Sequence, residues 1–105
     1  MFSVKDGEIY HTRGDTGSLN FTLKDENKKE ITGYSAVLSV KKKLRDKEYL
    51  FQVPIENGVC NITHEMTQEL PFGDYCYDIQ TKLSDGRVWT YGPYAYHLLA
   101  DVTTA

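Results

Sequence analysis

Hydrophobic and polar residues alternate along most of this chain, as they do in half-buried β-strands, and the helical period is almost absent. The longest alternating run covers residues 75–83, where Tyr75, Tyr77 and Ile79 share one face. Further strand-forming segments lie at residues 2–4, 8–11, 19–23, 34–40, 49–53, 59–62, 87–91 and 94–99. We expect these segments to give about seven to eight short strands.

Turn-forming residues separate the predicted strands. Asp85-Gly86 between two alternating runs is the strongest hairpin signal in the chain, and Asp6-Gly7 predicts a second hairpin near the N-terminus. Pro54 is expected to end the strand before it, and Gly92-Pro93 to separate the last two strands. The one helical candidate, residues 63–70, is expected to form a single turn before Pro71.

The spacing of strands and turns predicts an all-β fold, an immunoglobulin-like antiparallel β-sandwich of two sheets. Tyr75 follows Gly73 at the start of a strand, where such sandwiches turn a tyrosine hydroxyl back onto upstream backbone. We therefore expect Tyr77 to point inward on the same strand, and Trp89 on the next strand to pack between the sheets.

Length and composition fit one globular domain spanning residues 1–105. The chain has a mass of 12.0 kDa, and 40% of its residues are hydrophobic. It has no apolar run of the roughly 20 residues that a membrane helix needs. Its first residues lack the basic and apolar regions of a signal peptide, so we expect synthesis in the cytoplasm and no membrane association.

The residues that carry chemistry are few and scattered. The two cysteines, Cys60 and Cys76, are expected to be free thiols, because two thiols without a secretion signal are seldom bridged. His64-Glu65 resembles the start of a zinc-protease helix, but position 68 is Gln rather than His. Nucleophile elbows, phosphate loops and paired catalytic carboxylates are absent from the sequence. We predict a protein that is not an enzyme and uses no cofactor or metal.

Two further motifs are interpreted structurally. Arg13-Gly14-Asp15 is expected to be a turn in which Arg13 and Asp15 pair, rather than a cell-adhesion site. His11 and His97 stand alone on predicted strands, where a hydrogen-bonded or surface position is more common than metal ligation.

Charge is distributed unevenly along the chain, although the net charge is only −3. Residues 41–47 hold five basic side chains and one acidic one, whereas residues 54–81 hold five acidic side chains and no Lys or Arg. These segments are either a solvated hairpin tip and an acidic flank, or complementary patches that meet between copies or on a partner. Nucleic acid is a third candidate, but the basic run lacks interleaved aromatics and the net charge argues against it.

Tyrosines are more numerous than a core of this size needs. Tyr10, Tyr91, Tyr94 and Tyr96 cannot all point inward, and tyrosine is favoured at protein interfaces. The candidate interface residues are therefore the basic ones and two tyrosines near the C-terminus: Lys41, Lys42, Lys43, Arg45, Tyr94 and Tyr96.

The order of short motifs resembles a family of tailed-phage and prophage structural proteins. These motifs are Phe2-x-Val4, Gly7-x-Ile9, Thr12-Arg-Gly-Asp-Thr16, Leu70-Pro-x-Gly73-x-Tyr75-x-Tyr77-Asp-Ile-Gln80, Asp85-Gly-Arg-Val88 and Asp101-Val-Thr103. The chain is most similar to the N-terminal attachment domain of upper baseplate proteins from phages of Gram-positive bacteria. The resemblance covers nearly the whole chain and rests on motif order and spacing.

The resemblance implies a virion component of the tail or baseplate, a small module that docks through protein–protein contacts without catalysis. Its partners would be other phage structural proteins or copies of itself, in an oligomer or a larger assembly. Longer relatives continue past the final motif into receptor-binding parts, so docking is expected here rather than direct host recognition.

The main rival hypothesis is a small β-sandwich that binds a carbohydrate or another ligand through exposed Tyr and Trp. A sugar binder should place aromatics on a concave face among polar side chains, whereas an assembly module should present a flat or edge-strand interface. A cytoplasmic bacterial regulator is a third possibility.

Overall fold

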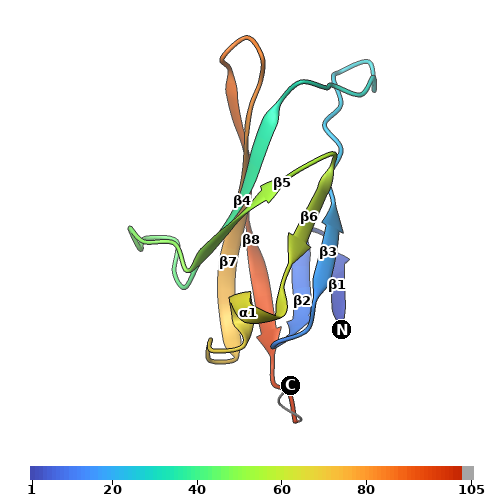
Figure 1. The fold of residues 1–105 in the computed structure, drawn as a ribbon. Coiled ribbons are helices and arrows are strands. Elements are labelled where there is room, and N and C mark those ends of the chain that lie inside the picture. The colour runs from blue at the N-terminus through green and yellow to red at the C-terminus, as the bar shows by residue number, and fades with distance from the viewer. Residues whose placement is uncertain (103–105) are drawn as a thin grey trace.

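A computed structural model describes residues 1–102 and shows eight strands and one helical turn (Figure 1). In chain order the elements are β1 (Phe2–Lys5), β2 (Glu8–Thr12), β3 (Gly17–Asn20), β4 (Ser35–Lys41), β5 (Phe51–Ile55), β6 (Val59–Ile62), α1 (His64–Thr67), β7 (Gly73–Lys82) and β8 (Val88–Leu99). The predicted helical turn and both predicted hairpins, β1–β2 and β7–β8, are confirmed.

The strands form two sheets. Six strands make a curled sheet in the order β1-β2-β8-β7-β4-β5, and β3 pairs with β6 in a small second sheet (Figure 1). The predicted all-β sandwich is therefore confirmed. One pairing departs from the antiparallel prediction, because β2 and β8 run parallel. These two strands are far apart in the sequence, so no tight turn forces them to be antiparallel.

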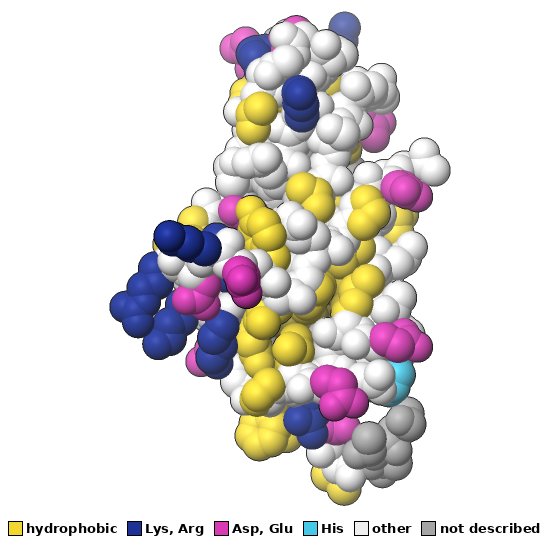
Figure 2. All heavy atoms as spheres, turned by 60° about the vertical axis from the view of Figure 1, so that its left-hand side comes forward, with side chains coloured by type: hydrophobic (Ala, Val, Ile, Leu, Met, Phe, Trp, Pro, Cys, Tyr) yellow, Lys and Arg dark blue, Asp and Glu magenta, His cyan; other side chains and the backbone are white. Residues whose placement is uncertain are grey.

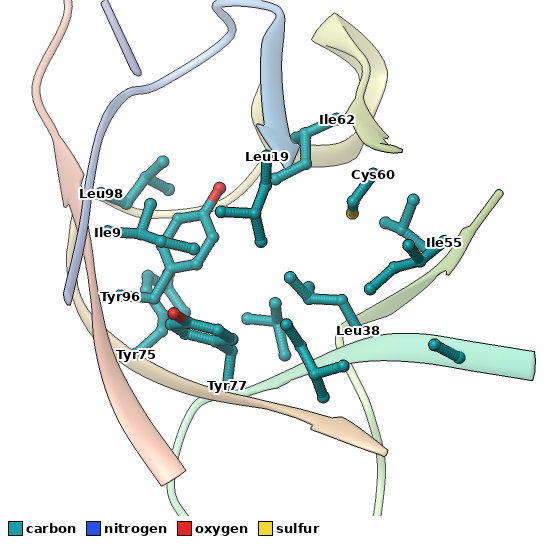
Figure 3. Close-up of a cluster of buried hydrophobic side chains, with 14 residues drawn as sticks. Ile9, Leu19, Leu38, Ile55, Cys60, Ile62, Tyr75, Tyr77, Tyr96 and Leu98 are labelled. Atoms are coloured by element: carbon teal, nitrogen blue, oxygen red, sulfur yellow. The ribbon is translucent and has the colours of Figure 1, made fainter. Parts of the chain in front are cut away.

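The core fills the space between the curled sheet and the small sheet (Figure 3). Leu38 of β4, Ile9 of β2 and Cys60 of β6 are completely buried. Tyr77 also points into the core, as predicted. Trp89 does not, since it is half-buried in the β7–β8 hairpin under the guanidinium of Arg87. The small sheet does not reach over that hairpin, so Trp89 does not lie between the two sheets (Figure 1).

The tyrosine predicted to turn back onto upstream backbone does so. The Tyr75 hydroxyl donates to the carbonyl oxygen of Pro71, which ties the start of β7 to the segment after α1. The Tyr77 hydroxyl donates to the carbonyl oxygen of Gly7 in the β1–β2 turn. Both tyrosines thus satisfy their polar end while burying the ring, as buried tyrosines must.

Two predicted strand boundaries at prolines differ from the structure. Pro54 lies within β5 rather than ending it, because β5 is an edge strand and the missing N–H of Pro54 leaves no sheet partner unsatisfied. The segments predicted at residues 87–91 and 94–99 are joined in one continuous strand, β8, which begins at Val88 and whose pairing with β7 shifts near Asp78, opposite Gly92-Pro93. A shift of this kind lets a strand bend without ending.

A third difference concerns residues 19–23, where the paired strand ends at Asn20. Its partner β6 has only four residues, so pairing stops although Leu19 and Leu23 are both buried as the alternation predicted. The segment from Phe21 to Tyr34 then forms a long connection to β4.

The Arg13-Gly14-Asp15 segment is a turn, with Gly14 in the left-handed region, as predicted. The expected ion pair between Arg13 and Asp15 is wrong. Arg13 instead pairs with Asp101, at 2.8 Å between a guanidinium nitrogen and a carboxylate oxygen, and Asp15 pairs with the N-terminal amine. The turn therefore contacts both the N-terminal amine and Asp101, which follows β8.

Candidate functional sites: a basic loop and an aromatic groove

The β4–β5 connection and its flanking residues carry the basic run. We call residues 41–50 the basic loop. It extends away from the two sheets (Figure 1), and Figure 2 shows its Lys and Arg side chains gathered on a protrusion at one side of the molecule. The backbone N–H of Asp46 donates to the carbonyl oxygen of Lys43 at 3.0 Å, and the backbone N–H of Lys43 donates to the carboxylate of Asp46 at 3.1 Å. These two hydrogen bonds close a turn within the loop. The loop therefore has a defined shape.

Two of its cations are held by aromatic rings of the same molecule. The Lys41 ammonium lies 5.0 Å from the centre of the Tyr49 ring, and the Lys42 ammonium lies 4.5 Å from that of Tyr75. Lys42 also donates to the backbone oxygen of Asp74 at 3.3 Å. Within residues 1–102, the side chains of Lys43, Arg45 and Lys47 make no ion pair or hydrogen bond. These three charges are therefore available to a partner.

The basic loop also exposes hydrophobic side chains, which sequence reasoning overlooked. Leu44 is 64% exposed, Tyr49 51% and Leu50 41%. Single exposed hydrophobic residues are ordinary, but three on one projecting loop are unusual for a monomer. The sequence did contain one sign of this exposed apolar surface, because Leu44 interrupts the Lys-rich run.

Of the two predicted interface tyrosines, only Tyr94 is at the surface. It is 39% exposed, and its ring packs against Gly7 and lies 5.6 Å from the ring of Tyr77. The prediction for Tyr96 is wrong, because this side chain is 1% exposed and lies in the core. Tyr94 and Tyr96 are two residues apart and therefore point to the same, inner face of β8. Tyr94 lies beside the β1–β2 turn, where its ring stays partly exposed, whereas Tyr96 lies among the core residues.

The acidic residues of segment 54–81 do not gather in one place. Glu56 lies in the β5–β6 turn, Glu65 and Glu69 lie in and after α1, and Asp74 and Asp78 lie on β7. The acidic character is therefore spread over the body of the molecule, whereas the basic character is concentrated in one loop.

His11 is buried and hydrogen-bonded at both ring nitrogens. Its Nε2 lies 2.6 Å from the carbonyl oxygen of Asp15, and its Nδ1 lies 2.6 Å from the hydroxyl of Tyr96. A carbonyl only accepts, so Nε2–H donates to it and Nδ1 accepts from the tyrosine. Desolvation and the nearby N-terminal charge lower the pKa of His11 from 6.5 to about 4. His11 is thus a neutral structural residue.

His97 has the opposite environment, on the outer face of the curled sheet. Its ring nitrogens lie 3.0 Å from a carboxylate oxygen of Glu8 and 2.8 Å from one of Asp74, and these hydrogen bonds raise its pKa. His97 thereby links β2, β8 and β7. Residues 1–102 contain no cluster of His, Cys, Asp or Glu arranged to hold a metal. Cys60 and Cys76 are free thiols, as predicted.

A second candidate site lies where the long β3–β4 connection meets the β5–β6 turn. A groove of about 580 Å³ opens there, and we call it the aromatic groove because Phe21 and Tyr34 line it. Its remaining lining residues are Asn20, Thr22, Glu30, Ile31, Thr32, Gly33, Ile55, Asn57, Gly58 and Val59. Sequence reasoning missed this site, because its residues come from segments that only the fold brings together.

The fold places the chain among all-β, sandwich-like proteins. Comparison with known proteins does not assign it to a particular family within that class. No family model, curated protein or solved structure matches the chain. In the part of the chain that the structure describes, no helix is long and apolar enough to span a membrane.

Proposed function

We propose that this chain is a non-enzymatic docking module that assembles through the basic loop, as a structural component of a phage or prophage tail or baseplate. The observation that carries the docking proposal is the composition of the loop, where Leu44, Tyr49 and Leu50 are exposed among five basic side chains. An apolar centre surrounded by charged groups is the usual organisation of a protein interface.

Charge balance supports a second copy of the chain as one partner. Residues 41–48 hold five basic and two acidic side chains, a net charge of +3, while the whole chain carries −3. The remaining residues therefore carry −6. Opposite charges on the loop and the body favour contacts between copies and disfavour contacts between two loops. Such a contact joins different surfaces of the two copies, which builds rings or larger assemblies.

The virion assignment is supported by the resemblance of the motif string to phage attachment domains. Two tyrosines of one of these motifs have a clear structural role, since Tyr75 ties β7 to Pro71 and Tyr77 ties it to the β1–β2 turn. Thr103 of the final motif lies outside the described residues. Mass spectrometry of phage particles purified from the host strain tests the assignment, and we expect peptides of this chain in the particles.

A charge-reversal pair tests the docking proposal. The double variant Lys43→Glu/Lys47→Glu changes two exposed side chains that have no partner within residues 1–102, so thermal stability should not change. Light scattering behind a sizing column should show that the variant has lost the oligomer. The matched control Lys29→Glu/Lys82→Glu makes the same charge change at exposed positions elsewhere and should still assemble. Equal masses for the two variants would contradict the proposal.

A further inference from the structure

The aromatic groove is built from three segments that are distant in the sequence. Asn20 to Thr22 form one wall, Glu30 to Tyr34 form the second, and Ile55 with Asn57 to Val59 closes the base. The β5–β6 turn at the base is held in place by a hydrogen bond of 2.8 Å from the Phe21 N–H to the carbonyl oxygen of Gly58. The groove is therefore a product of the tertiary fold.

The second wall is preformed by local hydrogen bonds. One carboxylate oxygen of Asp25 accepts from the backbone N–H groups of Asn27 and Lys29, each at 2.9 Å. The N–H of Ile31 donates to the carbonyl oxygen of Leu23 at 2.7 Å, and Leu23 itself is buried. The connection is therefore closed on itself by hydrogen bonds, and the buried Leu23 side chain anchors it to the rest of the molecule.

Aromatic rings support one another along the groove. The Phe21 ring centre lies 6.1 Å from that of Tyr34 and 5.5 Å from that of Tyr91, both edge to face. Phe21 and Tyr34 are only partly buried, so part of each ring remains open to the groove. Edge-to-face contacts fix ring orientation, which leaves fixed apolar surfaces for a ligand.

The polar side chains of the groove are not used by the fold. Asn20, Thr22, Glu30, Thr32 and Asn57 are all exposed. Across residues 1–102, the side-chain hydrogen bonds and ion pairs that hold the molecule together involve none of these five. They comprise two amides, two hydroxyls and one carboxylate, which together offer several donors and acceptors.

We infer that the aromatic groove binds a neutral saccharide. Sugar rings present C–H groups that pack on the electron-rich faces of aromatic rings, and hydroxyls that pair with amide and carboxylate groups. The twelve described lining residues include Glu30 but no Lys or Arg, so an anionic ligand such as a phosphate or a uronic acid would be disfavoured. The volume falls within the roughly 300–1,000 Å³ typical of small-molecule sites, enough for a short oligosaccharide.

The inference is tested by NMR titration of the ¹⁵N-labelled chain with three neutral trisaccharides: maltotriose, cellotriose and chitotriose. We expect at least one of them, at millimolar concentration, to shift the backbone amide signals of Thr22, Thr32, Tyr34 and Asn57. If none of the three shifts these signals, or if the shifts lie elsewhere on the surface, the inference is wrong. Either result leaves the basic-loop proposal standing, because that loop lines none of the groove.

Two variants separate binding from folding. Tyr34→Ala removes a stacking surface, and Glu30→Gln keeps shape while removing the carboxylate; each should weaken the saccharide Kd at least tenfold. Tyr49→Ala on the basic loop also removes an exposed ring and should leave the Kd unchanged. The melting temperature reports whether the Tyr34→Ala variant is folded. If that variant does not fold, Glu30→Gln still tests the site, because Glu30 is exposed and its substitution should not disturb folding. Unchanged affinity in Glu30→Gln and in folded Tyr34→Ala would contradict the assigned site.

Discussion

At the scale of single residues, buried tyrosines connect parts of the sandwich that the strands alone do not join. The hydroxyls of Tyr75, Tyr77 and Tyr96 reach Pro71, Gly7 and His11, respectively. Each ring is at most 5% exposed, so each side chain combines apolar packing with a satisfied hydroxyl. These contacts anchor β7 and β8 to the N-terminal hairpin and to the segment after α1.

We therefore expect Tyr77→Ala to lower the free energy of unfolding by roughly 3–5 kcal/mol, because it empties the core and leaves a backbone carbonyl without its donor. Tyr94→Ala, at the partly exposed position opposite Tyr77 on the adjacent strand, is the matched control and should cost less. Urea denaturation of both variants measures the two losses. A loss below about 1 kcal/mol for Tyr77→Ala would mean that the faces of β7 are reversed.

His11 should make the protein less stable in mild acid. The unfolded chain binds a proton at His11 below pH 6.5, whereas the folded chain binds it only near pH 4. Stability therefore falls as the pH falls from 6.5 to about 4, by up to about 3 kcal/mol from this group alone. Imidazole ¹⁵N signals measure the pKa directly. A His11 that titrates near 6.5 in the folded protein would contradict the buried, neutral assignment.

His97 provides the contrast in the same NMR experiment. Glu8 and Asp74 raise the pKa of His97 in the folded protein, so His97 stabilises the fold fully at pH values below its unfolded-state pKa of 6.5. This stabilisation is lost as the pH rises through the higher pKa that His97 has in the folded protein. The two histidines should therefore titrate on opposite sides of 6.5.

At the scale of elements, the β1–β2 hairpin depends on a close contact between its turn and β8. Gly7 has a φ of +84°, and a Cβ at this position would come within 2.7 Å of the Tyr94 ring. A side chain here would strain the backbone and also push the turn away from β8. Gly33 has a similar φ of +74°, but the space around it is open.

This comparison predicts different costs for two alanine variants. Gly7→Ala should combine the left-handed backbone penalty of roughly 1–2 kcal/mol with a steric clash, whereas Gly33→Ala should show the backbone penalty alone. Thermal unfolding of both variants measures the difference. Equal melting temperatures would contradict the packing of Tyr94 on the turn.

Period-two alternation was sufficient to predict most strands, because inner and outer positions differ clearly in polarity at residues such as Tyr77 and Asp78. It could not predict the parallel pairing of β2 with β8, since pairing partners distant in the sequence leave no local signal. It also misjudged Gly92-Pro93, where a shift in pairing allows β8 to continue.

At the scale of the whole molecule, the two candidate sites lie on different parts of the surface. The basic loop was predictable from its Lys-rich run. The cation–π contacts that hold Lys41 and Lys42 against tyrosine rings of the same molecule were not predictable. Tyr96 was assigned to the interface because alternation does not say which face of a strand is covered. The aromatic groove depends on the path of residues 21–34, and local sequence patterns do not predict where this long connection runs.

The central claim is that this molecule assembles through a positive loop and a negative body. The most direct test is the solution mass of the unmodified chain, measured by light scattering behind a sizing column at low and at high salt. We expect a defined oligomer at low salt that dissociates at high salt, because added ions screen contacts between exposed charges. A monomer at every salt concentration would contradict docking between copies.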